Sequence, residues 1–144
     1  MPMTSILIIN GPNLNLTGRR ETGIYGTTSF EDFLEALRAR YPDLSIDLFQ
    51  SNVEGELIDA LQAADGRRTG VILNAGGYTH TSVAIRDAVA AVGVPVIEVH
   101  MSSILAREEF RHTSLLAGVC RGTIMGFGME SYRLAVEALI QLAE

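Results

Sequence analysis

The sequence contains no lysine, because all 11 of its basic residues are arginines. This absence excludes Schiff-base chemistry and a lysine general base, whatever the fold. Cys120 is the only cysteine, which excludes an internal disulfide framework and a paired-thiolate metal site, and we expect it to be a small apolar core residue. The histidine spacings are not typical of zinc ligands, and no carboxylate cluster suggests magnesium. The sequence therefore predicts no metal.

Long apolar runs and a basic stripe are also missing. No run approaches the roughly 20 apolar residues that a membrane-spanning helix needs. The N-terminal residues lack the basic residue and the small-residue cleavage site of a secretory signal. The formal net charge is −6, and the arginines are scattered, whereas nucleic-acid binding needs clustered cations. We therefore expect a cytoplasmic protein that binds neither membranes nor nucleic acid.

Apolar residues are plentiful and evenly spread. They make up 47% of the 144 residues, which suits one domain over residues 1–144 with a core of ordinary size. Short, continuous apolar runs predict strands of a parallel sheet that is covered on both faces. These runs cover residues 5–10, 44–49, 70–73, 94–99 and 119–125.

Helical patterns separate the apolar runs. After Ser29, whose hydroxyl can cap a helix, apolar residues recur at helical spacing until Pro42. Similar patterns cover residues 57–61, 85–92 and 132–142. The alternation predicts an α/β fold: a flavodoxin-like, doubly wound, five-stranded parallel sheet in a three-layer α/β/α arrangement.

Polar residues follow the expected strands, at the edge where open α/β sheets bind ligands. Asparagines and glycines can merely shape turns, and for any single loop that interpretation is favoured. Several such loops at one edge favour a site instead. The residues concerned are Asn10, Asn13, Asn15, Gln50, Ser51, Asn52, Asn74, Gly76, Gly77, His80, Glu98, His100, Ser102 and Ser103.

The segment after the first strand, "NGPNLNLTGRRETGIYG", is too long for a simple turn. It lacks the lysine of a phosphate-binding P-loop and the glycine spacing of a dinucleotide fingerprint, so no nucleotide cofactor is indicated. A guanidinium near Tyr25, from Arg19 or Arg20, would favour the phenolate and make a base for a proton beside a carbonyl. The alternative is that Tyr25 packs against the following helix and the arginines are solvated.

Residues 74–88 join a strand to a helix. Asn74 and His80 could form hydrogen bonds with hydroxyl or carboxylate oxygens of a ligand. The alternative is a turn with a capping threonine or serine. Arg86 and Asp87 lie off the apolar stripe of the following helix, so we expect them to face solvent or another subunit.

Residues 98–114 are the richest stretch. Glu98 could orient or charge His100 and make it a general acid. Arg107 and Arg111 would share a helix face, where an anion between them would relieve their repulsion. Salt bridges to the adjacent glutamates are the alternative, but neighbouring helix positions do not face each other, so partners would have to come from elsewhere.

Taken together, the motifs resemble the type II 3-dehydroquinate dehydratases over essentially the whole chain. The motifs are "INGPNLNL", "GRRE", "YG", "QSN", "EGELID", "THTSVAIRDA", "EVH" and "AREEFRHTS". The resemblance implies a dodecamer built from trimers. It also implies cofactor-free elimination of water from 3-dehydroquinate, which gives 3-dehydroshikimate through an enolate. Such an activity belongs to the shikimate pathway of aromatic amino acid biosynthesis or to quinate breakdown.

The resemblance also implies residue roles. Tyr25 would take the proton beside the ketone, and Arg20 would hold it as a phenolate. Asn13 would position a water that stabilises the enolate oxygen. His100, supported by Glu98, would protonate the departing hydroxyl. The implied substrate-binding residues are Asn74, His80, Ser102, Arg111, the backbone of Met101 and, from a neighbouring subunit, Asp87. Arg107 would be more structural than catalytic.

Two alternatives to the enzyme are weighed. One is a catalytically altered paralogue that binds a related cyclic polyol acid, and the other is a flavodoxin-like domain that binds a phosphate or a flavin. The presence of both the expected base and the expected acid favours the enzyme, because binding alone needs neither. The sequence departs from the family pattern only at positions that are not expected to be catalytic: Thr17, Thr22, Val53, Ser103 and Leu105.

Overall fold

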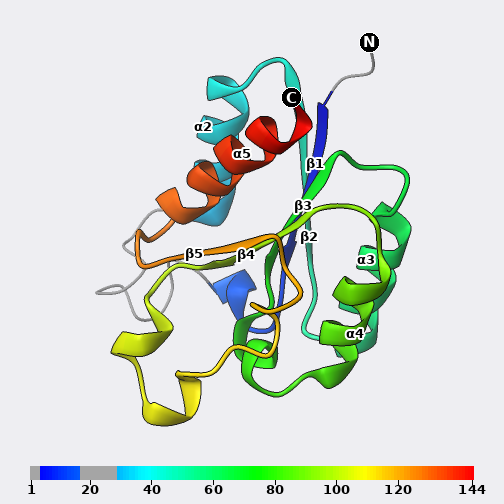
Figure 1. Cartoon of the computed structure of the whole chain (residues 1–144). Helices are drawn as coiled ribbons and strands as arrows, with labels where there is room; N and C mark the ends of the chain where they lie inside the picture. The colour runs from blue at the N-terminus through cyan, green and yellow to red at the C-terminus, as the bar shows by residue number, and fades with distance from the viewer. Residues whose placement is uncertain (1–3, 17–28) are drawn as a thin grey trace.

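The computed structural model describes residues 4–16 and 29–144. Five parallel strands form one sheet in the order β2-β1-β3-β4-β5 (Figure 1). The strands are β1 (Thr4–Asn10), β2 (Leu44–Gln50), β3 (Gly70–Asn74), β4 (Val96–His100) and β5 (Gly122–Met125). The predicted flavodoxin-like sheet is therefore confirmed.

Helices cover both faces of the sheet (Figure 1). They are α2 (Phe30–Arg40), α3 (Glu54–Ala64), α4 (Val83–Ala91) and α5 (Glu130–Ala143). Successive side chains of a strand point to opposite faces, so β1 contributes to two cores. Ile6 and Ile8 pack with α2 and α5, while Leu7 and Ile9 pack with α3 and α4. This is the predicted three-layer α/β/α arrangement.

Side-chain caps define where two of the helices begin. The Asp32 N–H donates to the Ser29 hydroxyl (3.1 Å), which confirms the predicted cap of α2. The Ile85 N–H donates in the same way to the Ser82 hydroxyl at the start of α4 (2.9 Å). The loop between β3 and α4 is thus closed by a capping serine, as one interpretation of residues 74–88 expected.

The strands β4 and β5 begin later than the predicted Val94 and Val119. The Val94 N–H donates to the Asp65 carboxylate (3.2 Å), and the Val119 N–H donates to the Leu116 carbonyl (3.0 Å). These amides are therefore used outside the ladder of the sheet, and each strand starts only after them. The apolar run alone could not show this competition.

The predicted helix that would carry Arg107 and Arg111 on one face is wrong. Two short 3₁₀ helices stand in its place, η3 (Ile104–Ala106) and η4 (Glu109–Arg111). The backbone between them is extended, with ψ of −169° at Arg107 and 149° at Glu108. Extended residues end the helical hydrogen-bond pattern, so the two arginines are not held by one helix.

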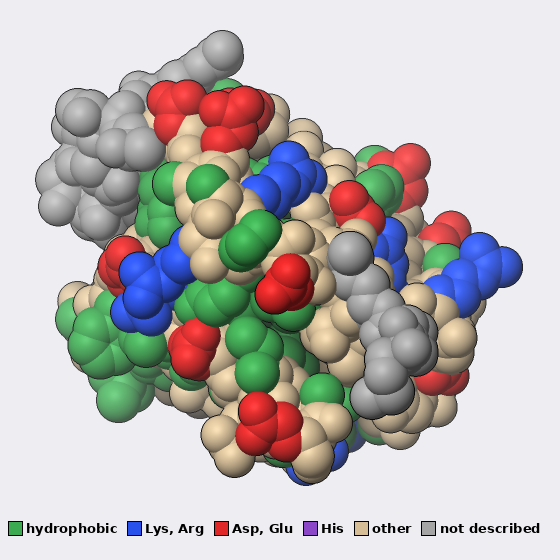
Figure 2. All heavy atoms as spheres, turned by 90° about the horizontal axis from the view of Figure 1, so that it is seen from above, with side chains coloured by type: hydrophobic (Ala, Val, Ile, Leu, Met, Phe, Trp, Pro, Cys, Tyr) green, Lys and Arg blue, Asp and Glu red, His purple; other side chains and the backbone are tan. Residues whose placement is uncertain are grey.

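No helix among residues 4–16 and 29–144 is long and apolar enough to cross a membrane. On the face that Figure 2 shows, arginine side chains are separated by acidic, hydrophobic and other residues and do not form one patch. Cys120 was expected to be a buried core residue, but it is only half-buried and packs against the core between the sheet and the helices α3 and α4.

Candidate active site

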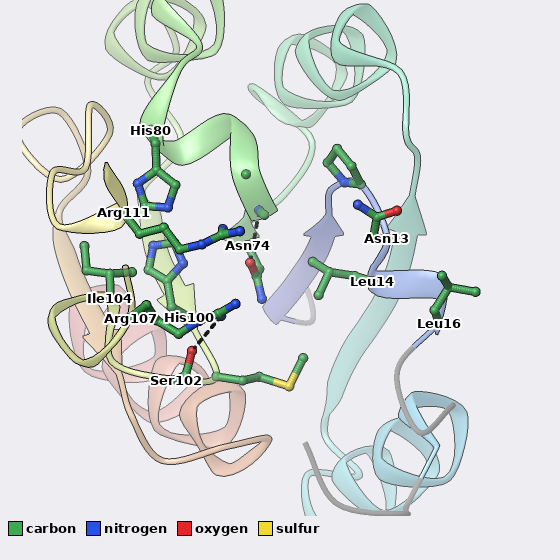
Figure 3. Close-up of a pocket in the computed structure, with 14 residues that line it drawn as sticks. Asn13, Leu14, Leu16, Asn74, His80, His100, Ser102, Ile104, Arg107 and Arg111 are labelled. Carbon is green, nitrogen blue, oxygen red and sulfur yellow. Dashed lines mark hydrogen bonds between the residues drawn. The ribbon is translucent and has the colours of Figure 1, made fainter. Parts of the chain in front are cut away.

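A pocket opens beyond the carboxyl ends of the strands, where β1 and β3 lie side by side in the sheet. This is the topological switch point, because the chain passes from β1 to β2 on one side of β1 and then crosses back from β2 to β3 on the other side. Figure 3 shows the residues that line the pocket. They are Pro12, Asn13, Leu14, Leu16, Asn74, Gly76, Gly77, His80, His100, Met101, Ser102, Ile104, Arg107 and Arg111.

The loops after β1 and β3 are held in close contact. The Gly11 N–H donates to the Asn74 carbonyl (2.7 Å). A Cβ atom at Gly11 would lie 2.4 Å from the carbonyl oxygen of Ala75, so only glycine allows the two backbones to approach this closely. The approach fixes the spacing between the loops that carry Asn13 and Asn74 into the pocket.

The carboxamide of Asn74 is held by buried partners. Its Nδ2 donates to the hydroxyl of Tyr132 on α5 (2.8 Å), and its Oδ1 accepts from the Gly76 N–H (3.2 Å). The Tyr132 hydroxyl in turn donates to Asn10 Oδ1 (2.8 Å), and all three side chains are buried. The orientation of Asn74 in the pocket is therefore set by a helix far away in sequence.

Glu98 and His100 form a buried pair at the end of β4. Residues two apart in a strand point to the same face. His100 Nε2 lies 2.7 Å from Glu98 Oε2. The carboxylate also accepts from the hydroxyls of Ser114 (2.6 Å) and Thr123 (2.8 Å), and it is fully buried. A carboxylate with these donors positions the imidazole at the pocket wall.

These contacts keep Glu98 charged. Burial raises the pKa of its carboxyl, but the hydrogen bonds from His100, Ser114 and Thr123 and the attraction of the His100 ring outweigh burial, so the pKa lies below its usual value of 4.5. The His100 ring therefore faces a charged acceptor at the pocket wall.

His80 has a different kind of partner. It ends the 3₁₀ helix η2 (Gly76–His80), and its Nδ1 lies 2.8 Å from the carbonyl oxygen of Thr113. Because a carbonyl can only accept, Nδ1 carries a proton, and in this tautomer Nε2 is left as an acceptor. This ring is suited to receive a hydrogen bond from a ligand hydroxyl.

Arg107 and Arg111 give this pocket a cationic wall (Figure 3). Glu108 lies 3.7 Å from Arg107 and 3.0 Å from Arg111, so the adjacent residue is their partner and the expectation of partners from elsewhere is wrong. The extended backbone at 107–108 brings the neighbouring Arg107 and Glu108 side chains together, whereas the Glu108–Arg111 pair has the i,i+3 spacing that a helix also allows. Arg107 also donates to the Ser102 hydroxyl (3.2 Å). Two guanidinium groups in the wall of one pocket suit an anionic ligand.

The structure brings most of the predicted site residues together. Glu98 stands behind His100, and Asp87 is exposed on α4, outside the pocket of its own chain. Arg20 and Tyr25 lie outside the described residues. The predicted residues that line the pocket are Asn13, Asn74, His80, His100, Met101, Ser102 and Arg111.

Several residues around the site were missed by the sequence interpretation. Thr123 lies directly beside Glu98 in the register of β4 and β5, and its hydroxyl interrupts an otherwise apolar strand. That single polar residue was the available signal. Nothing local marks Ser114 or Tyr132, whose partners lie 16 and 58 residues away.

No group of three histidine, cysteine, aspartate or glutamate side chains is placed to hold a metal ion in the part of the chain that the structure describes. The polar side chains that line the pocket are instead amide, imidazole, hydroxyl and guanidinium groups. Such groups bind the oxygens of a small polar acid through hydrogen bonds and charge.

Comparison with known proteins places this architecture in a family. The sequence model described as dehydroquinase class II matches residues 4–140. A 3-dehydroquinate dehydratase of Campylobacter jejuni is 53% identical over 141 residues, which cover 96% of this chain and 89% of the relative. One from an Exiguobacterium species is 57% identical over 137 residues, 94% of each chain.

A solved structure agrees with this assignment. The crystal structure of the type II dehydroquinase from Butyrivibrio crossotus superposes with a TM-score of 0.90 at 42% identity, covering 95% of this chain and 97% of that one. The matched residues include every strand at whose end the pocket lies. The chain therefore belongs to the type II 3-dehydroquinate dehydratases, the hydro-lyases also described as class II dehydroquinases.

Proposed function

We propose that this chain removes water from 3-dehydroquinate without a cofactor, with Tyr25 as the base and His100 as the acid. The Tyr25 phenolate takes the proton beside the ketone, and the electron pair moves onto the ketone oxygen as an enolate. The enolate then re-forms the carbonyl while the hydroxyl leaves with a proton from His100. The products are 3-dehydroshikimate and water, and proton transfer from Tyr25 back to His100 restores the enzyme.

The observation that carries this proposal is the buried Glu98–His100 pair facing a cationic pocket. A carboxylate that stays charged while buried stabilises an imidazolium, which is the form that can protonate a leaving hydroxyl. Because Nε2 of the ring is held by Glu98, Nδ1 is the nitrogen that delivers the proton. This geometry serves the chemistry of an acid and is more than a binding site requires.

The walls of the pocket fit the rest of the substrate. Arg111 and Ser102 suit its carboxylate, with the backbone at Met101, and the acceptor nitrogen of His80 suits a ring hydroxyl. Asn74 is oriented by buried partners and offers a fixed amide. Asn13, on the facing side of the pocket, would hold a water against the enolate oxygen.

The remaining roles follow from the family resemblance. Arg20 would keep Tyr25 ionised, and Asp87 would reach the pocket of a neighbouring subunit in a dodecamer built from trimers. The exposed position of Asp87 on α4 supports a role toward another chain. A cytoplasmic location and a place in the shikimate pathway or in quinate breakdown are likewise proposals from the resemblance.

The direct test is ultraviolet absorbance of the purified protein mixed with 3-dehydroquinate, without added metal or cofactor. The conjugated enone of the product gives a rising signal, and borohydride treatment of the enzyme should leave the rate unchanged, because the chain has no lysine. A flat trace with binding still detectable by calorimetry would support the altered paralogue instead.

Tyr25→Phe tests the assigned base. We expect kcat to fall by about 10²–10⁴-fold, the usual contribution of general acid–base catalysis, while substrate affinity and the circular dichroism spectrum stay close to those of the parent. The single hydroxyl removed is the group that would accept the proton. Turnover within a few-fold of the parent would contradict this role of Tyr25.

A further inference from the structure

The polar residues that end β2 lie beside the pocket but do not line it. Asn52 Oδ1 accepts two hydrogen bonds, from the Asn13 N–H (3.0 Å) and from Gln50 Nε2 (3.2 Å). The same Gln50 nitrogen donates to the Gly11 carbonyl (3.2 Å). The side-chain amides of Gln50 and Asn52 are therefore hydrogen-bonded to the loop that follows β1.

Asn13 needs such support because of its backbone. Its φ of 70° is the only positive φ of a non-glycine residue within ranges 4–16 and 29–144. The left-handed region is unfavourable for most side chains, although asparagine tolerates it better than others. An acceptor fixed opposite the Asn13 N–H stabilises this conformation. That conformation decides where the Asn13 side chain meets the pocket.

Asn52 also connects the loop after β3. Its backbone carbonyl accepts from the Tyr78 hydroxyl (3.3 Å), and Tyr78 belongs to η2, which ends at His80. The β1 and β2 loops leave the sheet together, because the Ser51 N–H donates to the Asn10 carbonyl (3.1 Å). One residue outside the pocket thus joins the three loops that follow β1, β2 and β3.

We propose that Asn52 is a positioning residue for the dehydration, which acts through Asn13 and has its own carboxamide oriented by Gln50. The Gln50 amide nitrogen can only donate, so the atom of the Asn52 carboxamide that faces it is the carbonyl oxygen. The same oxygen faces the Asn13 N–H. Removal of this acceptor frees the Asn13 backbone and displaces its side chain. The proposal deepens the proposed function and rests on it for the kinetic readout.

The variants Asn52→Ala and Asn52→Asp test whether the hydrogen-bond acceptor of residue 52 is what positions Asn13. Alanine removes the acceptor, whereas aspartate keeps an oxygen for both donors. We expect kcat of Asn52→Ala to fall roughly tenfold, within the range that small displacements of catalytic groups cause, with KM changed by less than about threefold. Asn52→Asp should stay within about threefold of the parent in kcat. The Asn52 side chain is exposed, so neither change removes core packing.

A double-mutant cycle with Asn13→Gly identifies the route of the effect. Glycine adopts the left-handed conformation without strain but has no side chain to position. If Asn52 acts through that side chain, Asn52→Ala has no further effect on kcat in the Asn13→Gly background. Effects that multiply in the double variant, or equal losses in the alanine and aspartate variants, would overturn the proposal.

Hydrogen exchange followed by mass spectrometry gives a readout without turnover. The peptide covering residues 10–16 should exchange at Asn13 about tenfold faster in Asn52→Ala than in the parent, and Asn52→Asp should retain protection. An inactive parent with this exchange pattern would refute the proposed function but support the anchoring of Asn13. An active parent with unchanged exchange in Asn52→Ala would refute only the role of Asn52.

Discussion

The two histidines of the pocket have the same side chain but different hydrogen-bond partners. The ring of His100, on the β4 side, has a buried carboxylate at Nε2, whereas the ring of His80, on the β3 side, has a neutral carbonyl at Nδ1. The first partner is a charged acceptor, while the second is a neutral acceptor that fixes which ring nitrogen carries a proton.

The difference is built by partners outside the pocket. Glu98 stays ionised because Ser114, Thr123 and His100 all donate to it; His100 lies on the same strand, whereas Ser114 and Thr123 come from two other parts of the chain. Thr113, the partner of His80, is adjacent to Ser114, so one short segment supports both rings. Under the proposed function, the partner of one ring nitrogen would decide whether the other nitrogen serves as an acid, as at His100, or as an acceptor, as at His80.

The largest expected effect separates the two rings kinetically. His100→Ala should lower kcat by about 10²–10⁴-fold because it removes the proposed proton donor, with a smaller change in KM. His80→Ala should raise KM by about 3–10-fold, since one uncharged hydrogen bond contributes about 0.5–1.5 kcal/mol, and leave most of kcat. Steady-state rates over a range of 3-dehydroquinate concentrations measure both.

The pattern of these two variants also tests the comparison itself. Each variant serves as the control for the other, because both delete an imidazole from the same pocket. Equal losses of kcat in the two variants would break the distinction between acid and acceptor. Recovery of the kcat of His100→Ala on addition of free imidazole would support the distinction, because it would show that the missing group is the imidazole.

A middle-sized effect concerns acid stability. Because the pKa of Glu98 is lower in the folded protein than its usual value of 4.5, its stabilisation is complete above that value and is lost as the pH falls through the folded pKa. Glu98→Gln should be less stable at pH 7 by about 1–3 kcal/mol, because the buried hydroxyl donors lose a charged acceptor.

Urea unfolding at several pH values measures this effect. The stability of the parent should approach that of Glu98→Gln as the pH drops below 4.5, because protonation removes the same charge. Other carboxyl groups titrate equally in both proteins and cancel in the difference. A stability difference that is independent of pH would contradict a depressed pKa of Glu98.

The smallest expected effect uses Cys120 as a reporter of the same charge. Burial raises the pKa of its thiol to about 12, and the negative charge of Glu98 adds to this. The native protein should therefore react very slowly with iodoacetamide at pH 8, and Glu98→Gln should react a few-fold faster, since only the thiolate attacks.

The measurement is the mass shift of the native protein over time, with the urea-unfolded chain as the fully reactive control. An unchanged rate in Glu98→Gln would mean that burial alone protects the thiol. Rapid labelling of the native parent would contradict the raised pKa.

The sequence predicted the features that depend on short-range pattern. The apolar runs predicted five strands and their sheet, and the separation of two residues in a strand placed Glu98 beside His100. The serine before α2 predicted its cap. In each case the interacting groups are close in sequence or repeat with the period of the element.

The missing parts depend on contacts between distant segments. Competition from Asp65 and Leu116 for backbone amides shortened two strands, and extended residues at 107–108 replaced an expected helix. The link from Tyr132 to Asn74 spans 58 residues, and that from Asn52 to Asn13 spans 39. Periodicity and spacing contain no information about such pairs.

The contact between Gly11 and Ala75 limits how this pocket can be re-engineered. Main-chain atoms meet there without room for one extra methyl group, so side-chain substitution cannot widen the junction of these two loops. Libraries that aim at bulkier substrates or inhibitors should therefore vary the wall near Ile104, where side chains define the shape. The pocket can therefore be reshaped through the side chains that line it, but not at this main-chain junction.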